Sequence, residues 1–140
     1  MSEQDGYMVQ GGCLCGAVRF SLHAKPIVAG YCHCSRCQRR TGTASGVSVM
    51  VDPEQVTWMS GERLITGWAP PDGHVKCFCS VCGAHLFSRS PDHRRMAIRM
   101  AAFDSDPGIR PSYRQFVDYA ASWEPIPEDG LPRYGGARPR

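Results

Sequence analysis

The stretch Cys77-Phe78-Cys79-Ser80-Val81-Cys82-Gly83 carries three of the eight cysteines in this chain of 140 residues. A stretch near the start, Cys13-Leu14-Cys15-Gly16, also has two close cysteines followed directly by glycine. Glycine readily adopts the positive φ that turns backbone N–H groups toward a metal-bound sulfur. Short Cys-x-Cys and Cys-x-x-Cys loops each deliver two ligands to a tetrahedral zinc ion. We therefore expect one structural zinc ion, which would staple the start of the sheet to its later strands, at Cys13, Cys15, Cys79 and Cys82.

The remaining cluster, Cys32-His33-Cys34-Ser35-Arg36-Cys37, offers only three thiols. Cys32 and Cys34 share one face of a predicted strand, because side chains on a strand alternate with a period of two. Cys37 follows in the first turn of a short predicted helix. Three protein ligands leave a fourth position free, which is typical of a catalytic zinc. We expect a second, catalytic zinc ion at Cys32, Cys34 and Cys37.

Two further side chains compete for these sites. His33 is a rival fourth ligand, but strand alternation points it away from its neighbours, so we expect it to pack beside the site. Cys77 could complete the second site and make all eight thiols inert, or crowd the first site, because it shares a face with Cys79. We assign Cys77 as a free thiol or as a group that touches the ligands. A metal-free alternative is that the pairs are unrelated buried thiols.

Short runs of alternating apolar residues, separated by turns rich in Gly and Pro, predict a mainly β domain. The expected strands cover residues 18–22, 27–32, 47–51, 55–59, 64–68, 74–79, 85–88, 96–100 and 116–119. Only Ser35 to Thr41 is predicted to be helical, with Ser35 as its N-cap and Gly42 at its end. We expect a single domain over residues 1–133 and a loose C-terminal tail over residues 134–140.

The aromatic and histidine residues outside these clusters predict packing roles. Trp58, Trp68 and Trp123 are expected to lie in the core or to form a cavity wall. The histidines that stand alone in the sequence are expected to be surface or packing residues rather than metal ligands; they are His23, His74, His85 and His93.

Charge and hydropathy indicate where the protein works. The formal net charge of +3 falls to zero once seven thiolates and two zinc ions are counted. The net charge therefore gives no reason to expect binding to nucleic acid. The N-terminus lacks the basic and apolar segments of a signal peptide, and no apolar run is long enough to cross a membrane. We expect a cytoplasmic protein whose cysteines bind metal rather than form disulfides. The oligomeric state stays open, with a homo-oligomer among the possibilities.

Taken together, these motifs resemble the glutathione-dependent formaldehyde-activating enzymes, a group that includes the centromere protein V relatives. The resemblance rests on Gly12 to Phe20, Tyr31 to Gly42 and Phe78 to Phe87, and continues at Trp123 and Asp129-Gly130-Leu131-Pro132. It implies a β-tent, a mainly β arrangement of small antiparallel sheets similar to Mss4. It also implies the same division of the seven cysteines into a structural and a catalytic zinc site.

The resemblance implies that the protein joins glutathione to formaldehyde as S-hydroxymethylglutathione, which is formally a carbon–sulfur lyase reaction run in reverse. Zinc held by three thiolates is a poor Lewis acid, so we expect it to hold the glutathione sulfur rather than to activate water. Arginine matches the carboxylates of glutathione as a planar fork. The candidates beside the metal-bearing turn are Arg36, Arg39 and Arg40, and the alternative for all three is a solvated helix face.

Two other functions are compatible with the sequence. One is a non-catalytic zinc scaffold that binds protein or nucleic acid. Against it, the chain lacks a long basic or proline-rich extension, because Arg138-Pro139-Arg140 is too short to be one. The other is a lyase that acts on a different glutathione thioether.

Overall fold

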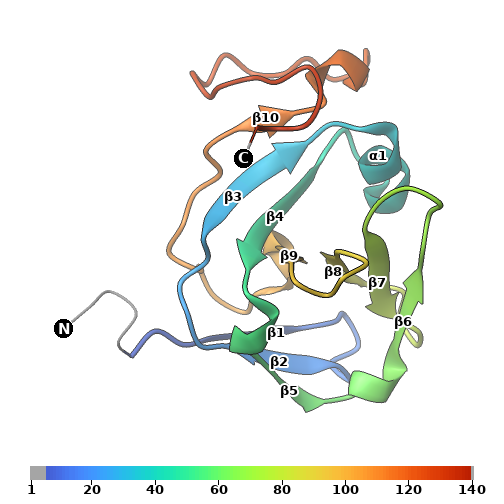
Figure 1. The fold of residues 1–140 in the computed structure, drawn as a ribbon, viewed down its shortest axis with the longest axis vertical. Helices are drawn as coiled ribbons and strands as arrows, with labels where there is room; N and C mark the ends of the chain where they lie inside the picture. The colour runs from blue at the N-terminus through green and yellow to red at the C-terminus, as the bar shows by residue number, and fades with distance from the viewer. Residues whose placement is uncertain (1–5, 140) are drawn as a thin grey trace.

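The computed structural model describes residues 6–139 and contains two β-sheets (Figure 1). The smaller sheet has the strand order β1-β2-β5, and the larger has the order β10-β3-β4-β9-β8-β7-β6. The strands are β1 (Val9–Gly12), β2 (Arg19–Leu22), β3 (Val28–Cys32), β4 (Gly46–Val51), β5 (Val56–Ser60), β6 (Ile65–Trp68), β7 (Val75–Cys79), β8 (His85–Arg89), β9 (Met96–Arg99) and β10 (Arg114–Gln115). Paired strands are antiparallel, apart from β10, which runs parallel to β3. The expected mainly β fold with small sheets and one short helix is confirmed.

The hydrophobic core joins the two sheets. Phe20 of β2 is 1% exposed and lies in the same buried cluster as Val49 of β4 and Ile98 of β9. Trp58 of β5 links the sheets, because its ring lies 5.8 Å from that of Phe20 and 5.4 Å from that of Phe87 on β8. The alternation of apolar residues along these strands therefore predicts their buried faces correctly.

The other two tryptophans differ from Trp58. Trp68 ends β6 and is 57% exposed, yet it lines a cavity, as one of the two expectations for it allows. Trp123 is 67% exposed, so its expected place in the core or in a cavity wall is wrong. The difference follows from position: Trp58 sits on a strand between the sheets, whereas Trp123 lies outside the regular strands.

The α-helix of the described residues, α1 (Ser35–Thr41), begins shortly after β3, and Figure 1 shows it at the upper end of β3 and β4. Its N-cap is Cys34, whose sulfur accepts a hydrogen bond from the backbone N–H of Cys37 at 3.3 Å. The prediction of Ser35 as the N-cap is therefore wrong by one residue, because a cysteine sulfur takes the capping role that a hydroxyl usually has. Gly42 ends the helix with φ of 71°, as expected.

The C-terminal part differs from the expectation in two respects. The predicted strand over residues 116–119 is wrong: β10 ends at Gln115, and Val117–Tyr119 forms a 3-10 helix. The reason is Phe116, whose φ of 56° breaks the extended chain. Residues 134–138, expected to be loose, instead hydrogen-bond back to the β10 region, for example from Tyr134 N–H to the Arg114 carbonyl at 2.8 Å.

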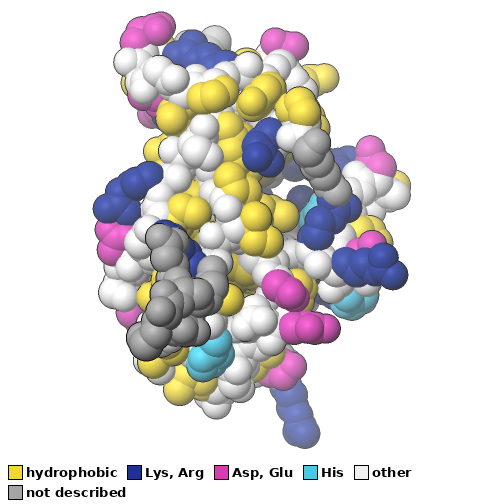
Figure 2. All heavy atoms as spheres, turned by 60° about the vertical axis from the view of Figure 1, so that its left-hand side comes forward, with side chains coloured by type: hydrophobic (Ala, Val, Ile, Leu, Met, Phe, Trp, Pro, Cys, Tyr) yellow, Lys and Arg dark blue, Asp and Glu magenta, His cyan; other side chains and the backbone are white. Residues whose placement is uncertain are grey.

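Among residues 6–139, no helix has both the length and the apolar character that are needed to span a bilayer. Figure 2 shows one face of the molecule, on which basic and acidic side chains lie among one another around a band of hydrophobic side chains. Neither sign of charge dominates the face seen there.

Candidate metal centres

The first cysteine cluster lies where the two sheets meet. Cys13 directly follows β1 of the smaller sheet, and Cys79 is the last residue of β7 in the larger sheet. The sulfurs of Cys13, Cys15, Cys79 and Cys82 all lie within 4.8 Å of one another, with 3.6 Å between Cys13 and Cys15 and 4.0 Å between Cys15 and Cys79. Four sulfurs at about 2.3 Å from a tetrahedral zinc ion are about 3.8 Å apart. The donor set therefore fits a zinc ion in both number and spacing.

Backbone N–H groups point at the sulfurs of this cluster. Val18 donates to the Cys13 sulfur at 3.3 Å, and Val81 donates to the Cys79 sulfur at 3.4 Å. Gly16 and Gly83 have φ angles of 81° and 76°, which the loops require after each cysteine pair. Such N–H···S contacts stabilise thiolates, so the loops suit a metal-bound form.

The second cluster lies between the end of β3 and the start of α1. The sulfurs of Cys32, Cys34 and Cys37 lie within 4.8 Å of one another, and among the residues that the structure describes no fourth metal-ligating side chain joins this group. Hydrogen bonds from the thiols of Cys32 and then Cys37 lower the pKa of Cys34 to about 2. The same contact with Cys34 is the main cause that raises the pKa of Cys32. Cys34 is therefore held as a thiolate by its two neighbours, and a thiolate is the form of cysteine that binds a thiophilic cation.

His33 lies between two of these cysteines but turns away from them. Its side chain is 3% exposed, and Arg114 donates a hydrogen bond to its Nε2 at 3.1 Å. Burial and the charge of Arg114 lower the pKa of His33, which keeps the ring neutral. Arg114 in turn makes an ion pair with Asp129 at 2.9 Å. The packing role that strand alternation predicts for His33 is thus the one observed.

Cys77 belongs to neither sulfur group among the described residues. It lies on β7 on the same face as Cys79, is 2% exposed, and burial raises the pKa of its thiol. Cys77 is therefore a buried thiol of the core.

The three candidate arginines of α1 have different surroundings. Arg36 makes an ion pair with Asp72 at 2.6 Å. The half-buried Arg40 donates to the carbonyls of Cys77 and Phe87, at 2.8 and 3.0 Å, and to a serine hydroxyl. Burial, followed by repulsion from Arg99, lowers its pKa to about 10. Arg39 is exposed and has no hydrogen bond or ion pair with any residue in the described part of the chain.

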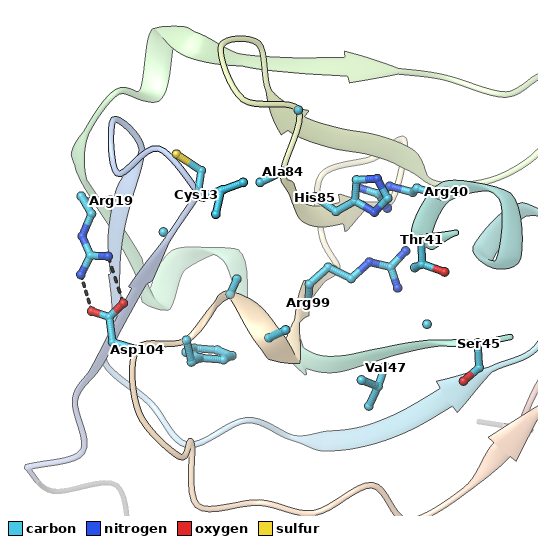
Figure 3. A pocket seen from close by; sticks show the side chains of 17 residues that line it. Cys13, Arg19, Arg40, Thr41, Ser45, Val47, Ala84, His85, Arg99 and Asp104 are labelled. Atoms are coloured by element: carbon cyan, nitrogen blue, oxygen red, sulfur yellow. Dashed lines mark hydrogen bonds and ion pairs between the residues drawn. The ribbon is translucent and has the colours of Figure 1, made fainter. Parts of the chain in front are cut away.

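A cavity of about 670 Å³ opens beside α1, and Figure 3 shows Arg40, His85 and Arg99 at the end near this helix. The Nε atom of Arg99 is buried without a hydrogen-bond partner among the described residues. Burial, followed by the charges of Arg40 and Arg99, lowers the pKa of His85 to about 4, so this histidine is neutral. Arg19 and Asp104 form an ion pair at the other end of the cavity. Among the described residues, the end of the cavity near α1 therefore has two cations and no carboxylate beside them, which suits an anion.

Sequence reasoning missed Arg99, His85 and Gly46 as parts of this cavity. A Cβ atom on Gly46 would lie 2.2 Å from Nη1 of Arg99, so the glycine makes room for the guanidinium. Alternation along residues 96–100 does place Arg99 on the opposite face from Met96 and Ile98. That signal could have shown that Arg99 points away from the core, but not what it faces.

Known proteins resemble this chain in both sequence and fold. The sequence profile described as glutathione-dependent formaldehyde-activating enzyme matches residues 8–119. None of the curated proteins matches the chain. A crystal structure of a Rhodobacter sphaeroides protein is similar, with a TM-score of 0.55, 22% sequence identity, and coverage of 73% of this chain and 91% of that chain. At this identity the likeness concerns the fold alone, whereas the profile covers both cysteine clusters. The chain belongs to the glutathione-dependent formaldehyde-activating enzyme family.

Proposed function

We propose that this protein is a zinc-dependent enzyme of the carbon–sulfur lyase type that forms or cleaves adducts of glutathione, such as S-hydroxymethylglutathione. The observation that carries the proposal is the unequal number of sulfurs: four gather in one cluster and three in the other. A zinc ion held by Cys32, Cys34 and Cys37 would keep the glutathione sulfur deprotonated and close to a carbonyl carbon. The four-sulfur cluster would hold a structural zinc ion with no open position.

Side chains of this protein supply the positive charges that would bind the carboxylates of glutathione. Glutathione carries two carboxylates, and the end of the large cavity near α1 presents Arg40 and Arg99, which have no carboxylate partner among residues 6–139. Arg99 is less engaged than Arg40, because its guanidinium makes a single long hydrogen bond among residues 6–139, from Nη1 to the Ser48 hydroxyl at 3.4 Å. We assign a carboxylate of glutathione to Arg99, with Arg40 and the exposed Arg39 adding positive charge. Arg36 contributes less, since Asp72 already neutralises it.

The reaction also needs a proton for the oxygen of the adduct. Burial lowers the pKa of Lys76, while the thiolates of Cys37 and Cys34 act in the opposite direction, so its ammonium lies within electrostatic reach of the second cluster. We assign proton donation to Nζ of Lys76, with solvent as the alternative source. The eight cysteines are free, which is compatible with the reducing cytoplasm that we propose as the location.

The test compares two single variants with the wild type. Zinc content is measured by mass spectrometry, and glutathione binding by calorimetry on protein kept reduced. We expect two zinc ions and glutathione binding in the wild type, and one zinc ion with no binding in Cys34→Ser. Cys77→Ser is the matched control and should keep both zinc ions and binding. A wild type that holds both zinc ions but binds no glutathione would favour the non-catalytic scaffold instead.

A further inference from the structure

A second cavity, of about 460 Å³, lies next to the first. Like the first it is lined by basic side chains, from Arg36, Arg39, Arg40 and Lys76, but it also has an aromatic wall. Its walls include the aromatic rings of Trp68 and Phe78, and the two cavities share Arg40, Gly83 and His85. The side chain of Trp68 is 57% exposed and faces this cavity, so it is available for contact with a ligand.

The pleat of β6 and β7 explains why the aromatic wall exists. Trp68 pairs with Lys76 in the register of these strands, and Thr66 pairs with Phe78. Because side chains alternate along a strand, Trp68, Lys76 and Phe78 lie on one face, while Cys77 and Cys79 lie on the other face and enter the core. β6 is the last strand of the larger sheet, so no neighbouring strand of the described residues covers Trp68 from that side.

Helix α1 carries both Cys37 of the three-sulfur cluster and Arg40 of the aromatic cavity, although the cysteines of the cluster do not themselves line the cavity. Residues three and four positions apart on a helix lie on the same side of it. Cys37 therefore lies on the side of α1 that also carries Arg40 and Thr41, and these two residues line the first cavity. Arg40 also lines the second cavity. A sulfur held at Cys37 would thus have a polar, cationic cavity and an aromatic cavity within reach.

The size of the second cavity does not match formaldehyde. Formaldehyde has two non-hydrogen atoms and is close in size to a water molecule, whose share of liquid water is about 30 Å³. The cavity of about 460 Å³ falls in the range of sites that hold ring-bearing ligands. On the proposed function, the backbone and carboxylates of glutathione would occupy the first cavity, of about 670 Å³.

We propose that the group carried on the glutathione sulfur is aromatic, and that its ring packs against Trp68 and Phe78. The substrate class is then an aromatic aldehyde and its hemithioacetal with glutathione. The sulfur forms a bond to the aldehyde carbon, the carbonyl π bond opens onto oxygen, and that oxygen takes one proton; the reverse reaction releases aldehyde and thiol. This inference rests on the proposed function, because it needs glutathione at the three-sulfur cluster.

The experiment measures the affinity of the zinc-loaded protein for glutathione, S-methylglutathione and S-benzylglutathione by calorimetry. We expect the wild type to bind the benzyl thioether at least tenfold more tightly than the methyl thioether. Trp68→Ala should reduce this preference to less than threefold and leave the affinity for the methyl thioether unchanged. Trp68→Phe should keep most of the preference, because it keeps a ring. Trp123→Ala replaces another exposed tryptophan and should change nothing.

The possible failures are distinguishable. If glutathione binds and the wild type shows no preference for the benzyl group, the aromatic assignment is wrong and the proposed function stands. The same holds if Trp68→Ala keeps the full preference. If the loaded protein binds none of the three compounds, the proposed function and this inference both fail.

Discussion

The two cysteine clusters should contribute very differently to the stability of the fold. An ion held by the first cluster closes the chain from Cys13 to Cys79, a loop of roughly 67 residues, for which chain entropy gives about 4.4 kcal/mol. An ion held by the second cluster closes roughly six residues, from Cys32 to Cys37, and the same relation gives about 2.2 kcal/mol. For a chain of this size, 1 kcal/mol shifts the melting temperature by about 3 °C. The expected losses on removing each link are therefore about 13 °C and about 7 °C.

The perturbation is a pair of double variants that remove two ligands from each site. Cys79→Ser with Cys82→Ser should lower the melting temperature about twice as much as Cys34→Ser with Cys37→Ser. Cys79 is fully buried, so part of its loss comes from placing a hydroxyl in the core rather than from losing metal. Cys77→Ser measures that part, because Cys77 lies on the same strand and face and is 2% exposed.

The assay is calorimetric melting in reducing buffer, with zinc content measured on the same samples. Each double variant should lose one zinc ion. The decrease in melting temperature for Cys77→Ser is subtracted from that of the Cys79 and Cys82 variant. If the remainder is equal to or smaller than the decrease for the Cys34 and Cys37 variant, the view that the first cluster links the two sheets is refuted.

Three further predictions concern the cationic cavity and the C-terminal contacts. Arg99→Ala should weaken glutathione binding by about tenfold to a hundredfold, as loss of a charge-assisted hydrogen bond would. Gly46→Ala should weaken binding less, because it displaces the guanidinium of Arg99. Calorimetry with a melting control would test both variants, and unchanged affinity in Arg99→Ala would contradict the assignment of a glutathione carboxylate to Arg99. The folded protein keeps the pKa of His85 near 4, below the usual value of about 6.5. The unfolded chain therefore binds more protons, and the stability of the fold decreases as pH drops from 6.5 toward 4. Urea unfolding of His85→Gln should show a shallower decrease, and a pH profile identical to that of the wild type would refute this. Arg114→Ala leaves Asp129 without its ion-pair partner and should destabilise the fold by about 2 kcal/mol in urea unfolding; a loss well below 1 kcal/mol would mean that the pair is dispensable.

The sequence predicts those elements whose signal is contained in a few neighbouring residues. Alternating apolar residues mark β2 and β4, and Gly42 marks the end of α1. The close spacing within each cysteine pair likewise anticipates which sulfurs come together. Local spacing is enough here because two residues on one strand face or in one tight turn are brought together without help from the rest of the fold.

Elements that depend on distant partners escape such reasoning. β1 has little apolar alternation, and a Cβ on its Gly11 would lie 2.3 Å from the Ala102 carbonyl oxygen and 2.7 Å from the Phe20 ring. The strand exists because it fits against those groups, which only the folded chain brings close. The same holds for the approach of Arg99 to Gly46, since the two residues lie on different strands.

Helix α1 illustrates both what the sequence predicts about the site and what it does not predict. The sequence places Arg36, Arg39 and Arg40 beside the second cluster, and all three line the aromatic cavity. Their charges are not equivalent, however, because Asp72 neutralises Arg36 from a loop more than thirty residues away. A sequence pattern can show that cations are near a site, whereas their availability depends on tertiary contacts.

The pairing of β10 with β3 ties the far end of the chain to the second cluster. Gln115 is the register partner of Cys32, and the carbonyl of Pro132 and the N–H of Tyr134 bond the neighbouring Arg114. A fusion partner attached closely to the C-terminus, or a truncation before residue 132, would consequently disturb a cysteine located a hundred positions earlier. Purification tags for this protein are better placed at the N-terminus, and long-range damage of this kind should be considered before any truncated form is called inactive.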